Sequence, residues 1–332
     1  MSSLTDAYEA EILNFDRSRE IERTCNRIRE IMRTKLKRRG LVVAVSGGID
    51  SSVCAALCVK ALGAGKVLLI RLPETDSAID TQDRSTQLIE HLGTDHLTHD
   101  IAPTLEAIGC YEARDEAIRN VFPNYTVGWK NKITIKGGLK GQINHFTLVV
   151  QSPDKEIFEQ RLGIKEYLQI VAATNYKQRI RKTIEYFHAD RLNYAVVGTP
   201  NRLEYDQGFF VKNGDGSADI KPIAHLYKTQ VYALAKALEL PPEICNAIPT
   251  TDTYSLPQGQ DEFYFALDHK RMDMALWAYN RGSTAEDLAN VLGIDTERAV
   301  YIYKDIETKR QTTLYLQYHP FLIEPMPEIR HD

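Results

Sequence analysis

The pattern of apolar and polar positions predicts strands that alternate with helices over much of the chain. Short β-branched apolar runs such as 41–45 are typical of buried strands, and stretches such as 51–62 continue with apolar residues at helical spacing. The expected strands are 41–45, 67–72, 96–100 and 194–198, and the expected helices are 51–62, 81–92, 104–108, 164–188 and 228–238. Because a helix between two strands returns the chain across the sheet, this order predicts an α/β fold with a doubly wound parallel sheet.

Helical segments are expected on both sides of this core. Residues 7–37 place Ile12, Ile21 and Ile28 on one repeating face, which predicts one amphipathic helix that acts as a lid or a dimer helix. Residues 263–316 carry alternating charge and are also typical of helix. The expected division is an N-terminal helical segment, a nucleotide-binding domain and a C-terminal helical segment, with bounds of 1–40, 41–262 and 263–332.

One region departs from the alternation of strands and helices. Residues 129–135 and 145–151 alternate polar and apolar side chains, and three glycines between them suit a turn. We interpret residues 124–163 as an inserted β-hairpin. It either decorates the surface or forms a substrate cover or an interface element.

The strand at 41–45 ends in a loop whose residue types suit a bound phosphate. The Ser-Gly-Gly sequence at 46–48 lets the backbone approach an anion, and Asp50 with two serines then opens the following helix. The loop is not a Walker A motif, because no lysine lies between Val42 and Val59. An ordinary glycine turn capped by Asp50 is the alternative, but the strand, loop and helix context favours a phosphate site.

Composition limits the partners and the compartment. The 332 residues carry a net charge of −4, with 43% hydrophobic and 26% charged residues, which suits a globular enzyme and predicts no nucleic-acid partner. No apolar run reaches the roughly 18 residues of a membrane helix, and the N-terminus lacks a signal-peptide pattern. We therefore expect no membrane partner and a cytoplasmic location. Five scattered cysteines indicate neither a disulfide framework nor a zinc site.

Four motifs connect the loop to a known chemistry. Residues 46–51, SGGIDS, resemble the SGGxDS loop of the ATP pyrophosphatases, which split ATP between its α and β phosphates. The motifs at 175–181 (NYKQRIR), 197–204 (VGTPNRLE) and 208–223 (GFFVKNGDGSADIKPI) resemble those of the NAD synthetases. The resemblance covers most of residues 40–262 and implies the adenine nucleotide alpha hydrolase-like fold. It also implies the family's reaction, in which the carboxylate of deamido-NAD attacks the α-phosphate of ATP, pyrophosphate leaves, and ammonia displaces AMP.

The resemblance implies a role for each matching position. ATP would be held by Ala44, Val45, Ser46, Gly47, Gly48, Ile49, Asp50, Ser51, Thr199, Lys228 and Thr250. Asp50 and Glu204 would bind Mg²⁺, and deamido-NAD would be held by Arg179, Lys212, Asp219 and Lys309. The catalytic step would depend on Asp50, Lys212, Lys228 and Thr250. Carboxylates suit Mg²⁺, and fixed cations and hydroxyls suit the charge that develops at the α-phosphate.

Departures from the family leave the acyl substrate open. Thr308 stands where the family has the histidine of a His-Lys pair, and the insertion at 124–163 is extra. A related ATP pyrophosphatase that adenylates another carboxylate is therefore the alternative function. A nucleotide-binding regulatory protein without turnover is a third hypothesis, but the complete set of matching site residues argues against it.

Nitrogen supply and assembly follow from length and from the resemblance. A glutamine-hydrolysing domain would need about 250 further residues, so we expect free ammonia or a separate ammonia-supplying protein as the nitrogen source. The resemblance also implies a homodimer.

Overall fold

The centre of the molecule is a four-stranded sheet in the order β3-β2-β1-β7, with every neighbouring pair parallel. The computed structural model describes residues 4–77, 79–136, 145–247, 254–259, 264, 267–326 and 328–329. The strands are β1 (Leu41–Ala44), β2 (Val67–Arg71), β3 (Asp95–Thr98) and β7 (Ala195–Val196). The predicted parallel sheet is confirmed, and each strand begins within one residue of its expected position.

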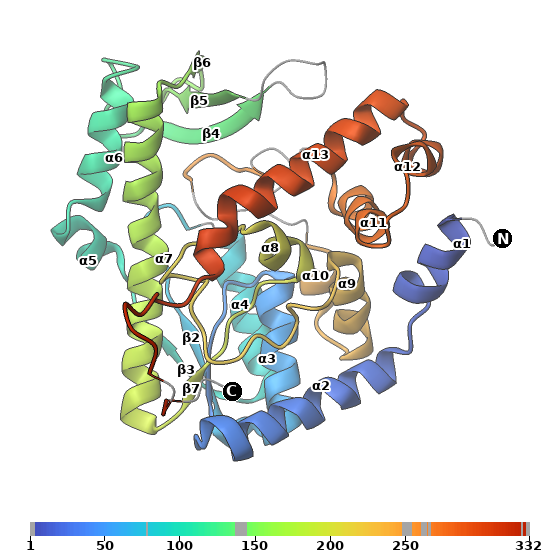
Figure 1. The fold of residues 1–332 in the computed structure, drawn as a ribbon. Helices are drawn as coiled ribbons and strands as arrows, with labels where there is room; N and C mark the ends of the chain where they lie inside the picture. The colour runs from blue at the N-terminus through green and yellow to red at the C-terminus, as the bar shows by residue number, and fades with distance from the viewer. Residues whose placement is uncertain are drawn as a thin grey trace.

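Helices cover both faces of this sheet, which confirms the doubly wound arrangement (Figure 1). Side chains alternate along a strand, so Val43 and Leu69 enter one apolar cluster while Val42 and Leu68 enter another. The first cluster contains residues of α2 (Arg17–Ile31), α3 (Ile49–Leu62), α4 (Ile79–Leu92), α9 (Lys228–Ala237) and α10 (Pro242–Cys245). The second contains residues of α5 (Ala102–Ala107), α6 (Cys110–Arg119) and α7 (Ile164–Leu192).

The N-terminal segment is interrupted, so the prediction of one helix over 7–37 is wrong in detail. It consists of α1 (Leu4–Tyr8), the π-helix η1 (Glu9–Leu13), α2 and a second π-helix, η2 (Met32–Leu36). Asp16 has extended backbone and accepts a hydrogen bond from the Arg19 amide, so it starts a new helix as an N-cap. The break lets Tyr8 and Ile12 pack against the C-terminal helices while α2 packs against α3 and α9.

The C-terminal third is helical in its described part, as predicted. It contains α11 (His269–Asn280), α12 (Ala285–Leu292), α13 (Thr296–Thr313) and the short 3-10 helix η5 (Leu314–Gln317). The short helix α8 (Arg202–Gln207) lies against α13, where Gly208 approaches Thr313 so closely that a Cβ would stand 2.3 Å from the threonine Cβ. None of the described helices is long and apolar enough to cross a membrane.

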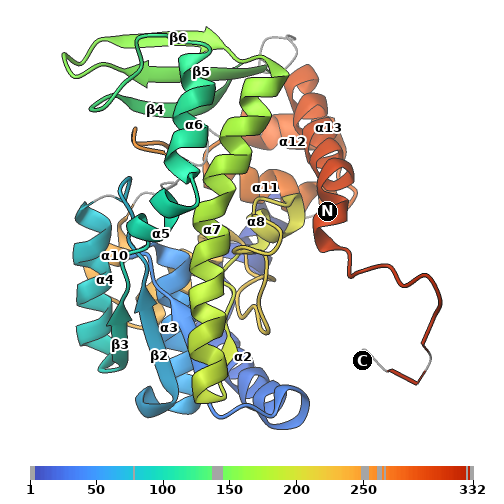
Figure 2. The same ribbon diagram turned by 90° about the vertical axis from the view of Figure 1, so that its left-hand side faces the viewer.

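The inserted region forms a separate antiparallel sheet of β4 (Lys130–Lys136), β5 (His145–Gln151) and β6 (Ile157–Arg161). The two predicted strands are confirmed, and the third strand was not expected because all five of its residues are exposed. The glycines of the predicted turn, at 137, 138 and 141, lie outside the described residues. Figure 2 shows this sheet beside the N-terminal end of α7, well apart from β2 and β3.

Candidate active site

The loop after β1 has the geometry of an anion site. Gly47 has a φ of +73°, and a Cβ there would stand 2.4 Å from the carbonyl oxygen of Thr81, so only glycine fits. The hydroxyls of Ser51 and Ser52 donate to the carbonyl oxygen of Gly48, at 3.0 and 2.8 Å. Helix α3 begins at Ile49, and its first amides and positive dipole end favour a bound phosphate.

Asn201 connects the two carboxylates that were predicted to bind metal. Its side-chain amide donates to Oδ1 of Asp50 at 3.1 Å, and its backbone amide donates to Oε2 of Glu204 at 3.1 Å. The same side chain caps helix α8, because its Oδ1 accepts from the amide of Leu203 at 2.9 Å. One buried residue therefore fixes the start of α8 and holds both carboxylates in place.

Lys228, the first residue of α9, forms an ion pair with Asp50 at the base of the site. Only 2% of its side chain is exposed. Burial acts to lower the pKa of Lys228, but the carboxylates of Asp50 and Glu204 outweigh burial and raise it above its usual value. The ammonium therefore stays charged, as contact with a phosphate requires.

The start of α9 is held by a buried carboxylate from α11. Asp273 accepts hydrogen bonds from the backbone amides of Lys228, at 3.2 Å, and Thr229, at 2.7 Å. Burial raises the pKa of Asp273 to about 7, while the bonds from Thr229 and Lys228 act to lower it. Asp273 thus positions Lys228 from a distant part of the chain.

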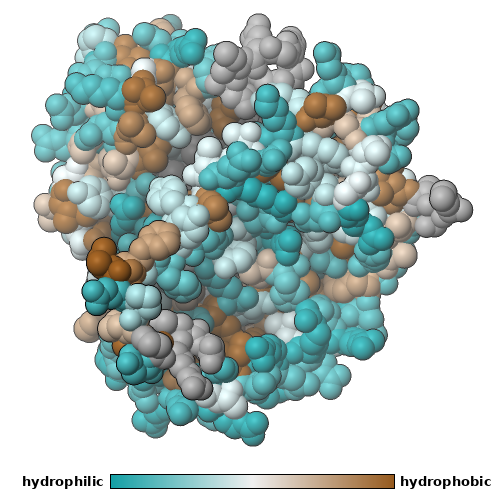
Figure 3. Space-filling model, viewed as in Figure 1, coloured by the Kyte–Doolittle hydropathy of each residue, from teal (hydrophilic) through white to brown (hydrophobic). Residues whose placement is uncertain are grey.

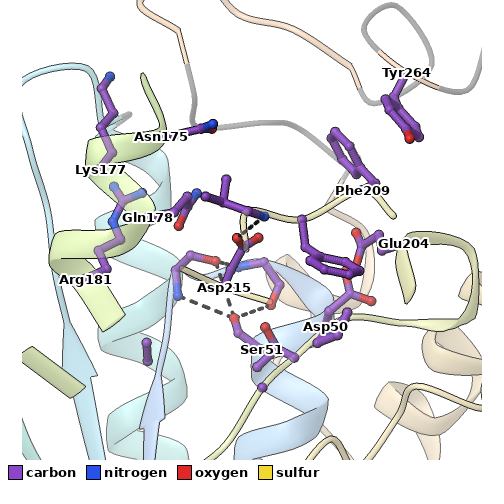
Figure 4. A pocket seen from close by; sticks show the side chains of 18 of the residues that line it. Asp50, Ser51, Asn175, Lys177, Gln178, Arg181, Glu204, Phe209, Asp215 and Tyr264 are labelled. Carbon is purple, nitrogen blue, oxygen red and sulfur yellow. Dashed lines mark hydrogen bonds between the residues drawn. The ribbon is translucent and has the colours of Figure 1, made fainter. Parts of the chain in front are cut away.

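A cavity of about 900 Å³ opens beside these groups. Figure 4 shows Asp50 and Glu204 on one side of it and Asn175, Gln178 and Arg181 of α7 on the other. The predicted residues that line it are Ala44, Val45, Ser46, Gly48, Ile49, Asp50, Ser51, Arg179, Thr199, Glu204, Lys212, Lys228 and Lys309. The structure therefore brings most of the predicted ATP and dinucleotide residues together around one space.

Two predicted residues lie outside the described lining, and a third lies outside the described residues. Gly47 lies outside the described lining, and its carbonyl oxygen accepts from Nε of Arg84 at 3.1 Å. Asp219 also lies outside it, and its carboxylate accepts from the amide of Val196 at 2.7 Å, which ties it to the end of β7. Thr250 lies outside the described residues.

The cationic residues of the predicted dinucleotide site contact one another and the C-terminal helix. Arg179 donates to the carbonyl oxygen of Lys212 at 3.3 Å, and Lys212 donates to that of Tyr315 at 2.8 Å. Lys309 donates to the carbonyl oxygen of Tyr264 and forms an ion pair with Asp305, both at 2.6 Å. Burial lowers the pKa of Lys309, and Asp305 acts in the opposite direction. These contacts connect α13 to the rim of the cavity.

A buried ionic cluster that includes the cavity-lining residue Lys177 was not predicted from the sequence. Lys177 of α7 pairs with Glu74 at 3.0 Å and with Asp76 at 2.6 Å, and Arg114 of α6 pairs with Asp76 at 2.8 Å. The cluster joins two helices to the segment that follows β2. Lys177 lies within the motif at 175–181, but its partners Glu74 and Asp76 lie about 100 positions earlier in the chain, so the pairing depends on the tertiary fold.

Comparisons with known proteins agree with this geometry. The sequence profile described as NAD synthase matches residues 20–125 and 140–313. A protein of Rhizobium meliloti (strain 1021) named NH(3)-dependent NAD(+) synthetase is 49% identical over 323 residues, which cover 97% of this chain and 96% of the relative. A protein of the same name from Rhizobium rhizogenes is 48% identical over 98% of both chains.

Solved structures of lower sequence identity show the same fold. NMN synthetase from Francisella tularensis has a TM-score of 0.64 and 22% identity, and covers 93% of this chain and 99% of its own. An NH3-dependent NAD synthetase from Campylobacter jejuni has a TM-score of 0.60 and 21% identity, and covers 93% of this chain and all of its own. The fold is thus the adenine nucleotide alpha hydrolase-like fold, and the profile match and the close relatives show that the chain belongs to the NAD synthase family.

Proposed function

We propose that this protein is an ATP-dependent ligase that converts deamido-NAD and ammonia to NAD, with release of AMP and pyrophosphate. The main observation in support is that one cavity is lined by the glycine loop at the start of α3 and by Asp50, Glu204 and Lys228. The near-complete coverage of relatives named NH(3)-dependent NAD(+) synthetase supports the same reaction. An enzyme that adenylates another carboxylate would share the ATP site and is the alternative.

The proposed chemistry is transfer of the adenylyl group to a carboxylate. An oxygen of the nicotinate carboxylate attacks the α-phosphorus of ATP, and the bond to the bridging oxygen of pyrophosphate breaks. The amides at the start of α3 and the hydroxyls of Ser46 and Ser51 hold the departing phosphates, and Lys228 offsets their charge. Ammonia then attacks the acyl carbon, and AMP leaves with one oxygen of the original carboxylate. Positioning and electrostatic stabilisation account for the rate, because no covalent enzyme intermediate is needed.

Asp50 and Glu204 fit a magnesium ion. Mg²⁺ prefers one or two protein carboxylates together with phosphate oxygens, and Asn201 holds these two carboxylates at the same cavity. Bound there, the ion would neutralise charge on the phosphates. Within the described residues no group of three acidic, histidine or cysteine ligands occurs, so the phosphates would supply the remaining ligands.

The roles of the predicted dinucleotide residues stay proposals. Arg179, Lys212 and Lys309 would hold deamido-NAD, and their position on the cavity supports this. Thr250 and Lys212 would assist the adenylyl transfer. Ammonia would come from solution or from a separate protein.

We also propose a homodimer that works in the cytoplasm. Large apolar side chains stand exposed on the C-terminal tail, where Phe321 is 80% and Ile323 is 99% accessible, and apolar surface gathers at this edge in Figure 3. Exposed apolar patches commonly mark protein interfaces. The five cysteines are free thiols, as expected in a reducing compartment.

The experiment that tests the function is a balanced product assay. Purified protein receives ATP, Mg²⁺, ammonium and deamido-NAD, and NAD, AMP and pyrophosphate are measured together. We expect the three products in equal amounts, with none formed when ammonium is replaced by glutamine. AMP release with another carboxylate, and none with deamido-NAD, would support the alternative function. ATP cleavage to ADP would contradict both.

A further inference from the structure

The inserted antiparallel sheet forms part of the cavity wall. Ile135 of β4 and His145 and Phe146 of β5 line the same cavity as the phosphate loop. Strand β6 lies on the outside of this sheet with all of its residues exposed. The insertion therefore has an inner side that faces the site and an outer side that faces solvent.

An aromatic pair marks the inner side. The rings of Phe146 and Tyr167, the latter on α7, lie 3.9 Å apart between centroids with 16° between their planes, and both residues line the cavity. Burial raises the pKa of Tyr167, so its ring belongs to a poorly solvated region. Tyr254, which is buried, also lines the cavity and packs into the apolar cluster under the insertion. Such a cluster provides a flat, apolar surface for a planar ring.

The edge of β4 fixes this surface by binding a second segment of the chain. The amide of Asn131 donates to Oγ of Ser255 at 2.8 Å, and its carbonyl oxygen accepts from the amide of Leu256 at 3.1 Å. The carbonyl oxygen of Ile133 accepts from the side chain of Gln258 at 2.6 Å. The segment that carries Tyr254 is therefore attached to the insertion through several hydrogen bonds along β4.

Helix α7 gives the distance between this surface and the nucleotide end of the cavity. Arg181 donates to the carbonyl oxygen of Leu72, just beyond β2, at 3.2 Å, and both residues line the cavity. Tyr167 stands 14 positions earlier on the same helix, a rise of about 21 Å at 1.5 Å per residue. Nucleotides in parallel sheets bind across the carboxyl ends of adjacent strands, so ATP would occupy the end near β1 and β2. The aromatic end remains for the second substrate.

We propose that the inserted sheet is a specificity element in which Phe146 and Tyr167 bind a heteroaromatic ring of the dinucleotide, which rests on the proposed function above. The site takes a planar nitrogen heterocycle that is joined to the reacting end through ribose and phosphate. Deamido-NAD has two such rings, and because the nicotinate carboxylate must reach the α-phosphate of ATP at the other end of the cavity, the ring assigned to this pair is adenine. The insertion thus acts in substrate selection, while adenylyl transfer takes place at Asp50 and Lys228.

The test compares Phe146→Ala with Ile157→Ala, a control on the outer strand β6 where the side chain is 60% exposed. Stacking of a base on an aromatic side chain corresponds to about 5- to 150-fold in affinity. We expect Phe146→Ala to raise the KM for deamido-NAD and the Kd from calorimetry at least about fivefold. The KM for ATP should stay within about twofold, because the ring lies far from the phosphate loop. Phe146→Tyr should restore binding, and Ile157→Ala should match the wild type.

Titration with nicotinic acid mononucleotide distinguishes the two rings, because this ligand lacks adenine. A loss confined to deamido-NAD is expected, because the pair binds the adenine ring, and an equal loss for both ligands would contradict the assignment to adenine. Unchanged affinity for deamido-NAD, or an equal rise in the KM for ATP, would overturn the proposal. Phe146→Leu keeps the volume without the aromatic face, and serves if the alanine variant does not fold.

The two proposals fail in different ways. Wild-type protein that makes NAD, with unchanged binding in Phe146→Ala, would leave the function intact and remove the role of the insertion. Wild-type protein that makes no NAD would refute the function. Calorimetry with deamido-NAD then tests the role of the insertion by itself, because a binding measurement requires no turnover. Absence of deamido-NAD binding to the wild type would overturn that role.

Discussion

The ion pair between Asp50 and Lys228 allows a direct test of whether the same two residues contribute to both stability and catalysis. Asp50→Asn removes the negative charge beside a lysine whose side chain is 2% exposed. Lys228→Met removes the cation and keeps a side chain of similar length. The double variant removes both charges, so it separates the loss of an uncompensated buried charge from the loss of the catalytic groups.

The expected magnitudes follow from burial. Breaking a buried ion pair by removing one partner costs about 3–5 kcal/mol of unfolding free energy. Asp50 is 16% exposed and Glu204 still acts on the lysine, so Asp50→Asn should fall near the lower end of that range. Lys228→Met should cost about as much, because among the described residues Asp50 then keeps the bond from Asn201, together with partial access to water. The double variant should be at least about 2 kcal/mol more stable than the sum of the single losses predicts.

Urea unfolding measures these free energies, and AMP release measures turnover in the same samples. We expect all three variants to lose at least about a hundredfold in kcat/KM, including the double variant whose stability partly recovers. Additive stability losses, with a coupling below about 0.5 kcal/mol, would refute the account of a buried pair. Near-normal turnover in any variant would refute the catalytic assignment.

Three other variants test separate parts of the site. Lys212→Ala should raise the KM for deamido-NAD or lower kcat while the KM for ATP stays within about twofold, and a loss confined to ATP binding would reassign it. Burial raises the pKa of Asp273 to about 7 in the folded protein, whereas an aspartate in the unfolded chain titrates at about pH 4. The folded state therefore binds a proton that the unfolded state has lost, and this contribution to the free energy of unfolding falls as pH rises through about 7. Asp273→Asn should flatten that slope in urea unfolding at pH 5 and 8, and an unchanged slope would exclude Asp273 as its source. Gly208→Ala should lose about 2–4 kcal/mol in the same assay, because φ is +71° and Thr313 blocks the Cβ. A stability loss below about 0.5 kcal/mol would contradict that packing.

Local sequence signals were enough for the central sheet and the phosphate loop. The β-branched run at 41–45 and the glycines after it specify a strand and a tight loop through short-range sterics. The N-terminal break was missed because the capping role of Asp16 competes with a continuous apolar pattern over the same helix. Strand β6 was missed because Ile157–Arg161 is an exposed edge strand without a buried face.

The sequence predicted those site residues that lie within recognisable motifs, and it did not predict their contacts with distant parts of the chain. Asn201 belongs to a recognisable capping pattern with Glu204, but its bond to Asp50 spans 151 positions and depends on the tertiary fold. Asp273 contacts Lys228 across 45 positions, and nothing near it in sequence indicates a capping role. Asp219 was expected to hold substrate, whereas the structure places its carboxylate on the amide of Val196. Its role toward deamido-NAD remains a prediction.

The measurement that tests the central claim most directly is the fate of the carboxylate oxygen. Deamido-NAD labelled with ¹⁸O in its nicotinate carboxylate is converted with ATP and ammonium, and the AMP formed is analysed by mass spectrometry. Adenylation at this site predicts one ¹⁸O atom in the phosphate of AMP for each NAD formed. AMP without label would contradict the acyl adenylate, and label in inorganic phosphate would show that the carboxylate is activated by phosphorylation instead.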